Sequence, residues 1–279
     1  GQVGNNAGAF RTLTAQSVKQ VRQGVFVYDM GQNMVGVPRI TIANGRARGR
    51  IVLRFSEMLY PNLKESGNNV GMIMTENYRA ALSQDLYTMK AGPQAFQPRF
   101  TSHGFQYVEI TGIDRPLPVA SVEGIAISSV RSLTADYKTS SEKVNRLWSN
   151  LVWSNVDNFL TIPTDCPQRN ERMGWSGDIN VFSRTATYLS NADQFLTRHM
   201  YAMRDVQLPT GRFTDVAPVG GGQPGHAAGL RHRPQGADPR RFSVPEGNAT
   251  DAGLTRAHED ALAGQPAGPS TLARESLSG

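Results

Sequence analysis

The stretch Arg50–Met58, RIVLRFSEM, has the alternation of an extended chain. Successive side chains of a β-strand point to opposite faces. One face here carries Ile51, Leu53 and Phe55, and the other carries Val52, Arg54 and Ser56. The pattern predicts a half-buried strand whose first face packs against a core.

The chain around this stretch, from about Gly24 to Arg131, repeats the pattern, with Gly, Pro, Asn or Asp in the gaps. Apart from RIVLRFSEM, the expected strand segments are GVFVYDMG (24–31), VPRITIAN (37–44), DLYTMK (85–90), FQPRFTSHGFQYVEITGI (96–113) and VEGIAISSV (122–130). Strands that follow one another with no helical period between them favour an antiparallel β-sandwich. We therefore predict a β-sandwich domain over residues 24–133, preceded by an N-terminal extension over residues 1–23.

The hydrophobic period changes near Thr139 from that of a strand to that of a helix. Thr139 and Glu142 fit a capping box, and Pro163 ends the helical region. The apolar stripe of this first helix comprises Val144, Leu147, Trp148, Leu151, Val152, Val156, Phe159 and Leu160. We expect a second helix from about Asp178 to Leu189, and a third from about Ala192 to Val206 with a capping box of Asn191 and Gln194. The order predicts a multidomain β-then-α chain with its boundary near residues 131–140.

The composition changes again at Gly220–Gly222. From Gln223 onward the chain is rich in Gly, Pro, Ala and Arg, with Phe242 as its one aromatic residue and no Lys. Such a segment buries too little apolar surface to offset the entropy of ordering the chain. The sequence therefore predicts a disordered or frameshifted tail over residues 223–279.

Composition argues against several classes of protein. The formal net charge of +6 comes without a block of like charges, so we expect no nucleic-acid partner. Cys166 is the single cysteine, which excludes an intrachain disulfide and a zinc site built from cysteines. No apolar run approaches the roughly 20 residues that span a bilayer. We expect neither a cofactor nor a metal ion, because no dense oxygen-ligand loop or phosphate loop is present.

The N-terminus shows no targeting signal. It begins GQVGNNAGAF, without an initiator Met and without the basic and apolar regions of a signal peptide. The true start of the protein is therefore expected to lie upstream, and the compartment stays open.

Residues 164–178, TDCPQRNERMGWSGD, concentrate the groups that carry chemistry. The carboxylates of Asp165, Glu171 and Asp178 lie around one predicted helix–loop–helix junction. A carboxyl group close to other carboxylates can keep its proton near neutral pH, as acid–base catalysis requires. Trp175 offers a face for stacking on a sugar ring, and Arg169 offers directional donors. The residue types alone leave a plainer alternative open, in which the charges are solvated, Asp178 only caps a helix and Trp175 belongs to the core.

The lone thiol has a structural interpretation. A Cys–His nucleophile needs a positioned histidine, and neither His103 nor His199 has a partner that can be identified from the sequence. We therefore predict that Cys166 is structural, and that His103 is a turn or sandwich residue with an interdomain contact as the alternative.

The fifteen residues 164–178 closely resemble the signature DCPQR-x-ER-x-GW-x-GD of the bacterial α-L-rhamnosidases of glycoside hydrolase family 78. The resemblance continues, in the same order, over residues 24–222. It is carried by YDMGQNMVGVPRI, LRFSEML, PRFTSHGFQYVEITG, NRLWSNLVWSNVDNFLTIPTDCPQR and LPTGRFTDVAP.

The resemblance implies a β-sandwich followed by the first helices of an incomplete (α/α)6 barrel, with residues 134–222 as the N-terminal part of the catalytic domain. It implies inverting hydrolysis of terminal α-L-rhamnosyl residues from glycosides or polysaccharides, without a cofactor. By motif position, Glu171 matches the general acid. The residues that match the rhamnose-binding positions are Asp165, Arg169, Trp175 and Asp178.

The second carboxylate of the reaction has no match in this chain. In the family the general base lies downstream of the point where the resemblance stops, and Glu246, Glu259 and Glu275 match no motif. The resemblance therefore implies that this chain alone is inactive. The alternative is a non-catalytic carbohydrate-binding or degenerate protein.

Overall fold

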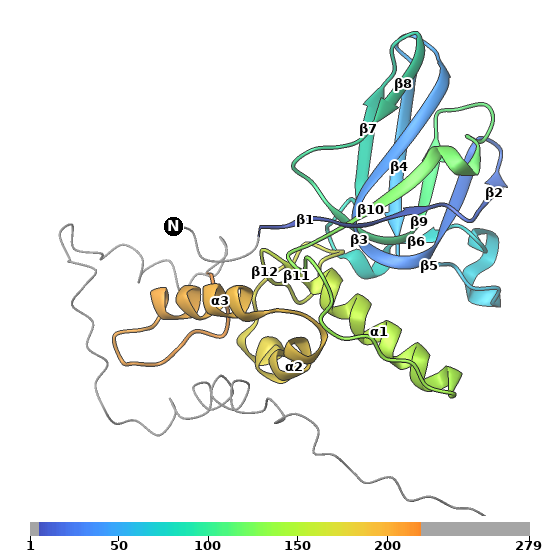
Figure 1. Ribbon diagram of the computed structural model, residues 1–279. Helices are drawn as coiled ribbons and strands as arrows, with labels where there is room; N and C mark the ends of the chain where they lie inside the picture. The colour runs from blue at the N-terminus through green and yellow to red at the C-terminus, as the bar shows by residue number, and fades with distance from the viewer. Residues whose placement is uncertain (1–5, 219–279) are drawn as a thin grey trace, which may run out of the picture. The chain divides into compact units, whose positions relative to one another are not determined.

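The computed structural model describes residues 6–218, and Figure 1 shows their strands and helices. The predicted tail over residues 223–279 lies outside this part. The strands are β1 (Gly8–Thr14), β2 (Ser17–Arg22), β3 (Val25–Gly45), β4 (Arg50–Ser56), β5 (Met58–Leu59), β6 (Ile73–Met74), β7 (Gln84–Thr88), β8 (Gly92–Phe96), β9 (His103–Thr111), β10 (Val122–Ser128), β11 (Phe159–Leu160) and β12 (Ile162–Pro163). The α-helices are α1 (Glu142–Asn158), α2 (Ser176–Leu189) and α3 (Asp193–Asp205), and short 3₁₀ turns are η1 (Lys64–Asn69), η2 (Glu76–Tyr78) and η3 (Val119–Ser121).

Eight antiparallel strands form the β-rich half, in the order β1-β10-β3-β9-β4-β7, with β2 and β8 also paired to β3. In β4, Ile51, Leu53 and Phe55 are fully buried, as the alternation of RIVLRFSEM predicts. The structure confirms the fold class: an antiparallel β-sandwich comes first, and α-helices follow it.

The two strands expected at 24–31 and 37–44 are one strand of 21 residues, β3. The strand bends rather than ends at Gly31, whose φ of +74° is the left-handed conformation that glycine adopts without penalty. Asp29 Oδ1 accepts the Gly31 N–H at 2.7 Å, and the register with β9 shifts between Asp29 and Met34. A bulge of this kind lets one strand change direction without losing its partners.

Part of the predicted N-terminal extension is built into the sheet. Strand β1 pairs with β10, and β2 pairs with β3. The side chains of Phe10, Leu13 and Val18 pack against the core, while their neighbours face solvent. The extension prediction is wrong for Gly8–Arg22, because an outer strand needs few apolar residues and its polar composition hides the alternation.

The three predicted helices exist, but their starts differ from the predicted caps. Helix α1 follows Ser141 rather than Thr139, and no side chain caps its first turn. Asn145 takes the place expected for Glu142, since its Oδ1 accepts the Thr139 N–H at 2.7 Å and its Nδ2 donates to the Thr139 carbonyl at 2.8 Å. The Thr139 capping box is therefore wrong, because Asn145 closes the preceding turn.

The second capping box is wrong as well. Helix α3 follows Ala192, and no side chain caps its first turn. Asn191 Oδ1 accepts the N–H of Asp193 at 3.4 Å, one residue before the Gln194 N–H that the predicted box requires. Helix α2 starts two residues before the expected Asp178 and ends at the expected Leu189.

One apolar core runs through the strands and the helices. Asp157, only 8% exposed near the end of α1, accepts the Val35 N–H of β3 at 2.8 Å. Ser128 Oγ at the end of β10 donates to the carbonyl of Val156 at 2.7 Å. These buried hydrogen bonds fix the end of α1 against the sandwich, just before the chain enters residues 164–178.

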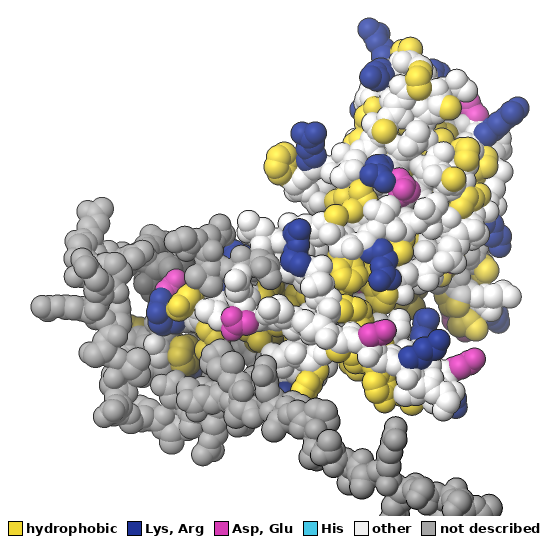
Figure 2. Space-filling view, in the orientation of Figure 1, with side chains coloured by type: hydrophobic (Ala, Val, Ile, Leu, Met, Phe, Trp, Pro, Cys, Tyr) yellow, Lys and Arg dark blue, Asp and Glu magenta, His cyan; other side chains and the backbone are white. Residues whose placement is uncertain are grey.

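The surface shows mixed charge. On the face in Figure 2, Lys and Arg side chains are spread singly over the sandwich instead of gathering in a stripe. None of the helices in residues 6–218 has the length and apolar character needed to cross a membrane.

Candidate active site

Residues 164–175 form a loop between β12 and α2, and we call it the motif loop. Asp165 closes its base twice: its N–H donates to the carbonyl of Met173 at 3.1 Å, and its Oδ1 accepts the Met173 N–H at 2.8 Å. Because the side chain of Asp165 holds the loop shut, its carboxylate has a fixed direction.

Glu171 lies inside this closed loop, with its side chain 15% exposed. Arg169 donates to Glu171 Oε2 from Nε at 3.1 Å and from Nη2 at 2.8 Å. Arg79, which follows η2 in the sandwich, reaches the same oxygen from Nη1 at 2.9 Å. Two guanidinium groups therefore bind Oε2, and Oε1 makes no hydrogen bond within residues 6–218.

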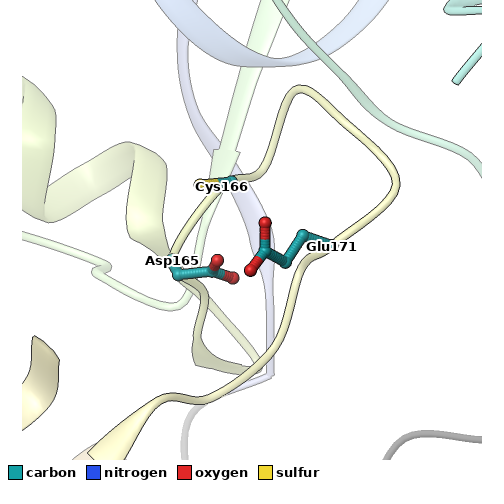
Figure 3. A group of neighbouring side chains, drawn as sticks. All are labelled: Asp165, Cys166 and Glu171. Atoms are coloured by element: carbon teal, nitrogen blue, oxygen red, sulfur yellow. The ribbon is translucent and has the colours of Figure 1, made fainter. Parts of the chain in front are cut away.

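Asp165, Cys166 and Glu171 form one cluster, with a side-chain O or S atom of each within 4.8 Å of the others. Figure 3 shows the two carboxylates facing each other across the loop. Burial, followed by the hydrogen bond with Asp165, raises the pKa of the Cys166 thiol to about 11. The thiol therefore stays protonated near neutral pH and lacks the thiolate that a nucleophile or a metal ligand requires. The two arginines on Glu171 also make the cluster a poor cation site.

Asp165 and Asp178 both line a cavity of about 540 Å³, within the range of about 300–1,000 Å³ typical of ligand pockets. Asp178 is exposed in the first turn of α2. The other lining residues are Ser154, Asn158, Phe159, Pro163, Thr164, Gly177, Ile179, Val181 and Phe182. The cavity thus combines carboxylates that can accept sugar hydroxyls with an apolar wall.

Trp175 lies at the junction of the motif loop and α2, half-buried and outside the apolar core. A returning segment after α3 holds this junction: Ser176 N–H donates to Asp215 O at 2.9 Å, and Ala217 N–H donates to Gly174 O at 3.0 Å. Trp175 itself forms a β-bridge with Val216. The backbone is therefore fixed on both sides, while part of the indole stays open to solvent.

The structure brings four of the five predicted site residues together in two groups, and Trp175 belongs to neither. Asp165 and Asp178 share the cavity, and Glu171 and Arg169 are paired beside Asp165. Trp175, Arg169 and Glu171 do not line the cavity. Asp165 belongs to both groups and connects them.

Residues of the sandwich that the sequence did not suggest support the motif loop. Arg79 binds Glu171, and Ser102 accepts a hydrogen bond from Arg172 Nη2 at 2.8 Å. Gly104 lies against the backbone of Gln168. A Gly inside a strand pattern was the one available signal, since it often marks a close approach of two backbones.

His103, beside these residues, serves the sandwich. Its Nε2 lies 3.1 Å from Asp85 Oδ2, and its ring stacks on Phe55 with centroids 4.1 Å apart. The prediction of a sandwich residue is confirmed by these partners.

His199 of α3 is buried behind the motif loop, with Gly174 next to its ring. Neither ring nitrogen has a hydrogen-bond partner in the described part of the chain. Burial lowers the pKa of His199 to about 4, so the ring is neutral at physiological pH.

Comparisons with known proteins identify the family. Residues 19–128 match the bacterial α-L-rhamnosidase concanavalin-like domain, and residues 132–229 match the bacterial α-L-rhamnosidase six-hairpin glycosidase domain. An α-L-rhamnosidase of Streptomyces avermitilis is 42% identical over 212 residues, which are 76% of this chain and 20% of that protein. One from Formosa agariphila is 38% identical over 195 residues, or 69% of this chain and 20% of that protein.

A solved structure gives the same result. The crystal structure of the Streptomyces avermitilis α-L-rhamnosidase complexed with L-rhamnose superposes with a TM-score of 0.73 at 41% identity, covering 79% of this chain and 21% of that one. The chain thus spans about 20% of the length of the curated relatives it matches. With both family domains matched in order, it belongs to the bacterial α-L-rhamnosidases, a family of glycoside hydrolases.

Proposed function

We propose that this chain contributes the acid side of an α-L-rhamnosidase active site, which removes terminal α-L-rhamnosyl residues from glycosides or polysaccharides. Glu171 is the general acid, and it gives its proton to the glycosidic oxygen as the bond to the anomeric carbon breaks. Asp165, Arg169, Trp175 and Asp178 hold the sugar. Support comes from one arrangement: Glu171 faces Asp165, and Asp165 lines the cavity that also holds Asp178.

The contacts around Glu171 leave one of its carboxylate oxygens without a hydrogen-bond partner among residues 6–218. Both arginines bind Oε2, which leaves Oε1 to carry the proton toward the leaving group. A general acid must lie within hydrogen-bond reach of the atom it protonates, and a carboxyl group fixed at one oxygen offers the other in a defined direction.

The spacing of the carboxylates supports a binding role for Asp165. An inverting glycosidase separates acid and base by about 6.5–9.5 Å so that a water fits between them. Oxygens of Asp165 and Glu171 lie within 4.8 Å, too close for that water. This spacing argues against Asp165 as the general base, so we place the base on a carboxylate outside the motif loop and assign Asp165 to the rhamnose hydroxyls.

Two forms of the protein test the function. One is the 279-residue chain, and the other, the extended chain, continues past Gly222 with the matching catalytic-domain sequence of the Streptomyces avermitilis relative. We expect the extended chain to hydrolyse alkyl α-L-rhamnosides and the 279-residue chain to bind L-rhamnose without turnover. Glu171→Gln should lower kcat of the extended chain by about 100-fold or more.

Glu142→Gln is the matched control, since Glu142 is an exposed carboxylate in the first turn of α1. Full activity of Glu171→Gln would refute the assignment of the acid. Rhamnose binding by both forms with turnover by neither would favour the alternative, a non-catalytic carbohydrate-binding protein.

A further inference from the structure

Arg79 is the one residue of the sandwich in ion-pair contact with the motif loop in the described part of the chain, at 2.9 Å from Glu171 Oε2. It shares this oxygen with Arg169, but the two arginines are anchored differently. Arg169 belongs to the motif loop itself. Arg79 belongs to the sandwich, so its contact ties the Glu171 carboxylate to a part of the chain outside the loop.

The backbone next to Arg79 is fixed by a buried tyrosine. Tyr78 is fully buried, and its hydroxyl accepts the Glu57 N–H at 2.8 Å and donates to the Gly104 carbonyl at 3.4 Å. Gly104 also lies against Gln168 of the motif loop. Tyr78, which precedes Arg79, and Gln168 of the motif loop thus both contact Gly104 of β9.

The conformation of Arg79 is unusual for its side chain. Its φ of 56° and ψ of −121° lie in a region that glycine occupies freely and other residues rarely adopt. Gly67 has nearly the same angles, φ 50° and ψ −125°. Glycine would adopt these backbone angles without strain, so the presence of an arginine suggests that its side chain has a role. That side chain contacts Glu171 through its guanidinium group.

We propose that Arg79 is a positioning residue for the general acid. This inference rests on the proposed function of Glu171. By holding Oε2 from the sandwich side, Arg79 fixes the carboxyl rotamer so that Oε1 points to the glycosidic oxygen. Charge-assisted hydrogen bonds have the strength and direction for this task, and a small misplacement of a catalytic group reduces the rate strongly.

Arg79→Gly tests the proposal, because it removes the guanidinium while giving the backbone a residue suited to its angles. We expect the unfolding temperature to stay close to that of wild type. In the extended chain, kcat for a methyl α-L-rhamnoside should fall about tenfold with little change in KM. For 4-nitrophenyl α-L-rhamnoside the loss should be much smaller, because a good leaving group needs little acid assistance.

Two further variants make the result specific. Arg79→Lys should recover part of the lost kcat, because lysine keeps the charge without the forked donors. Arg46→Ala, an exposed arginine between β3 and β4, should change neither substrate's kcat. Equal losses on both substrates, or a change confined to KM, would overturn the positioning role.

A measurement without turnover separates this inference from the proposed function. In the 279-residue chain, the Met173 N–H donates to Asp165 Oδ1 and reports closure of the motif loop. We expect its hydrogen exchange to be several-fold faster in Arg79→Gly than in wild type. Unchanged exchange would refute the anchor even if the enzyme is active. Faster exchange in this chain, together with full activity of Glu171→Gln in the extended chain, would uphold the anchor and reject the catalytic role of Glu171.

Discussion

Gly104 of β9 lies so close to Gln168 of the motif loop that a Cβ built on Gly104 would come within 2.6 Å of the Gln168 Cβ and 2.9 Å of its Cα. Real Cβ atoms do not approach other atoms this closely, so one of the two backbones must move if any side chain is added. The close contact positions the loop that carries Glu171 against the sandwich.

Gly104→Ala should therefore destabilise the protein by about 1–3 kcal/mol, the usual cost of overpacking a tight contact. Thermal unfolding of the 279-residue chain measures this change. Gly177→Ala is the control, because nothing lies within 4 Å of a Cβ there and alanine favours the helix. Equal stability of Gly104→Ala and wild type would show that the loop does not rest on β9.

The sequence predicted the structure correctly where one hydrophobic period continued over several residues. RIVLRFSEM predicted a strand and placed Ile51, Leu53 and Phe55 in the core, because alternation reports burial directly. It misled at the start of α1, where Thr139, Ser141 and Asn145 offer competing hydrogen bonds within seven residues. Geometry in three dimensions decides between such neighbours, and composition does not.

Only those residues of the candidate site that lie close together in the sequence could be predicted. The motif placed Asp165, Glu171 and Asp178 near one loop, and in the structure Asp165 lies beside Glu171 and also lines the cavity with Asp178. Arg79 could not be found in this way, because its contact with Glu171 joins distant parts of the sequence. No periodicity or spacing indicates which side chain of another domain will reach a loop.

The buried His199 should make the stability depend on pH. Its folded pKa of about 4 lies below the unfolded value of about 6.5, so the unfolded state binds the proton more readily. The stabilisation is complete above pH 6.5 and is lost as the pH falls toward 4, by about 3 kcal/mol in total. Denaturant unfolding at several pH values measures it. His199→Phe should flatten the slope between pH 6.5 and 4, and an unchanged slope would contradict the prediction.

Asp157 should act in the opposite direction. Burial raises its pKa to about 8, so the folded protein prefers the protonated carboxyl and loses stability as the pH rises from about 4 to 8. Asp157→Asn keeps an oxygen to accept the Val35 N–H and carries no charge, so it should unfold at a higher temperature than wild type at pH 8.

Asp157→Ala is the contrasting variant. It leaves the Val35 N–H without its acceptor, and we expect a loss of about 1–3 kcal/mol. If Asn and Ala destabilise equally at pH 8, the hydrogen bond to Val35 is not what the side chain contributes.

Cys166 should react slowly with thiol reagents. The rise of its pKa from 9.0 to about 11 reduces the thiolate fraction at pH 8 by about 100-fold relative to a free cysteine. Timed labelling with iodoacetamide and mass spectrometry measures the rate in the native protein and in urea. Cys166→Ser should retain rhamnosidase activity in the extended chain. Loss of activity in this variant would indicate that the thiol takes part in the reaction.

The stereochemistry of the product decides which task Asp165 performs. If Asp165 binds the sugar and a distant base activates water, hydrolysis inverts the anomeric carbon, and β-L-rhamnose is released first. If Asp165 were instead a nucleophile, α-L-rhamnose would be released first, since retaining glycosidases hold their carboxylates only about 5–5.5 Å apart. The contact within 4.8 Å makes this a real alternative. Proton NMR of the extended chain during the first minutes of hydrolysis distinguishes the two anomers. We expect the β-anomer, because the Met173 N–H holds Asp165 Oδ1 and ties this carboxylate to the base of the motif loop.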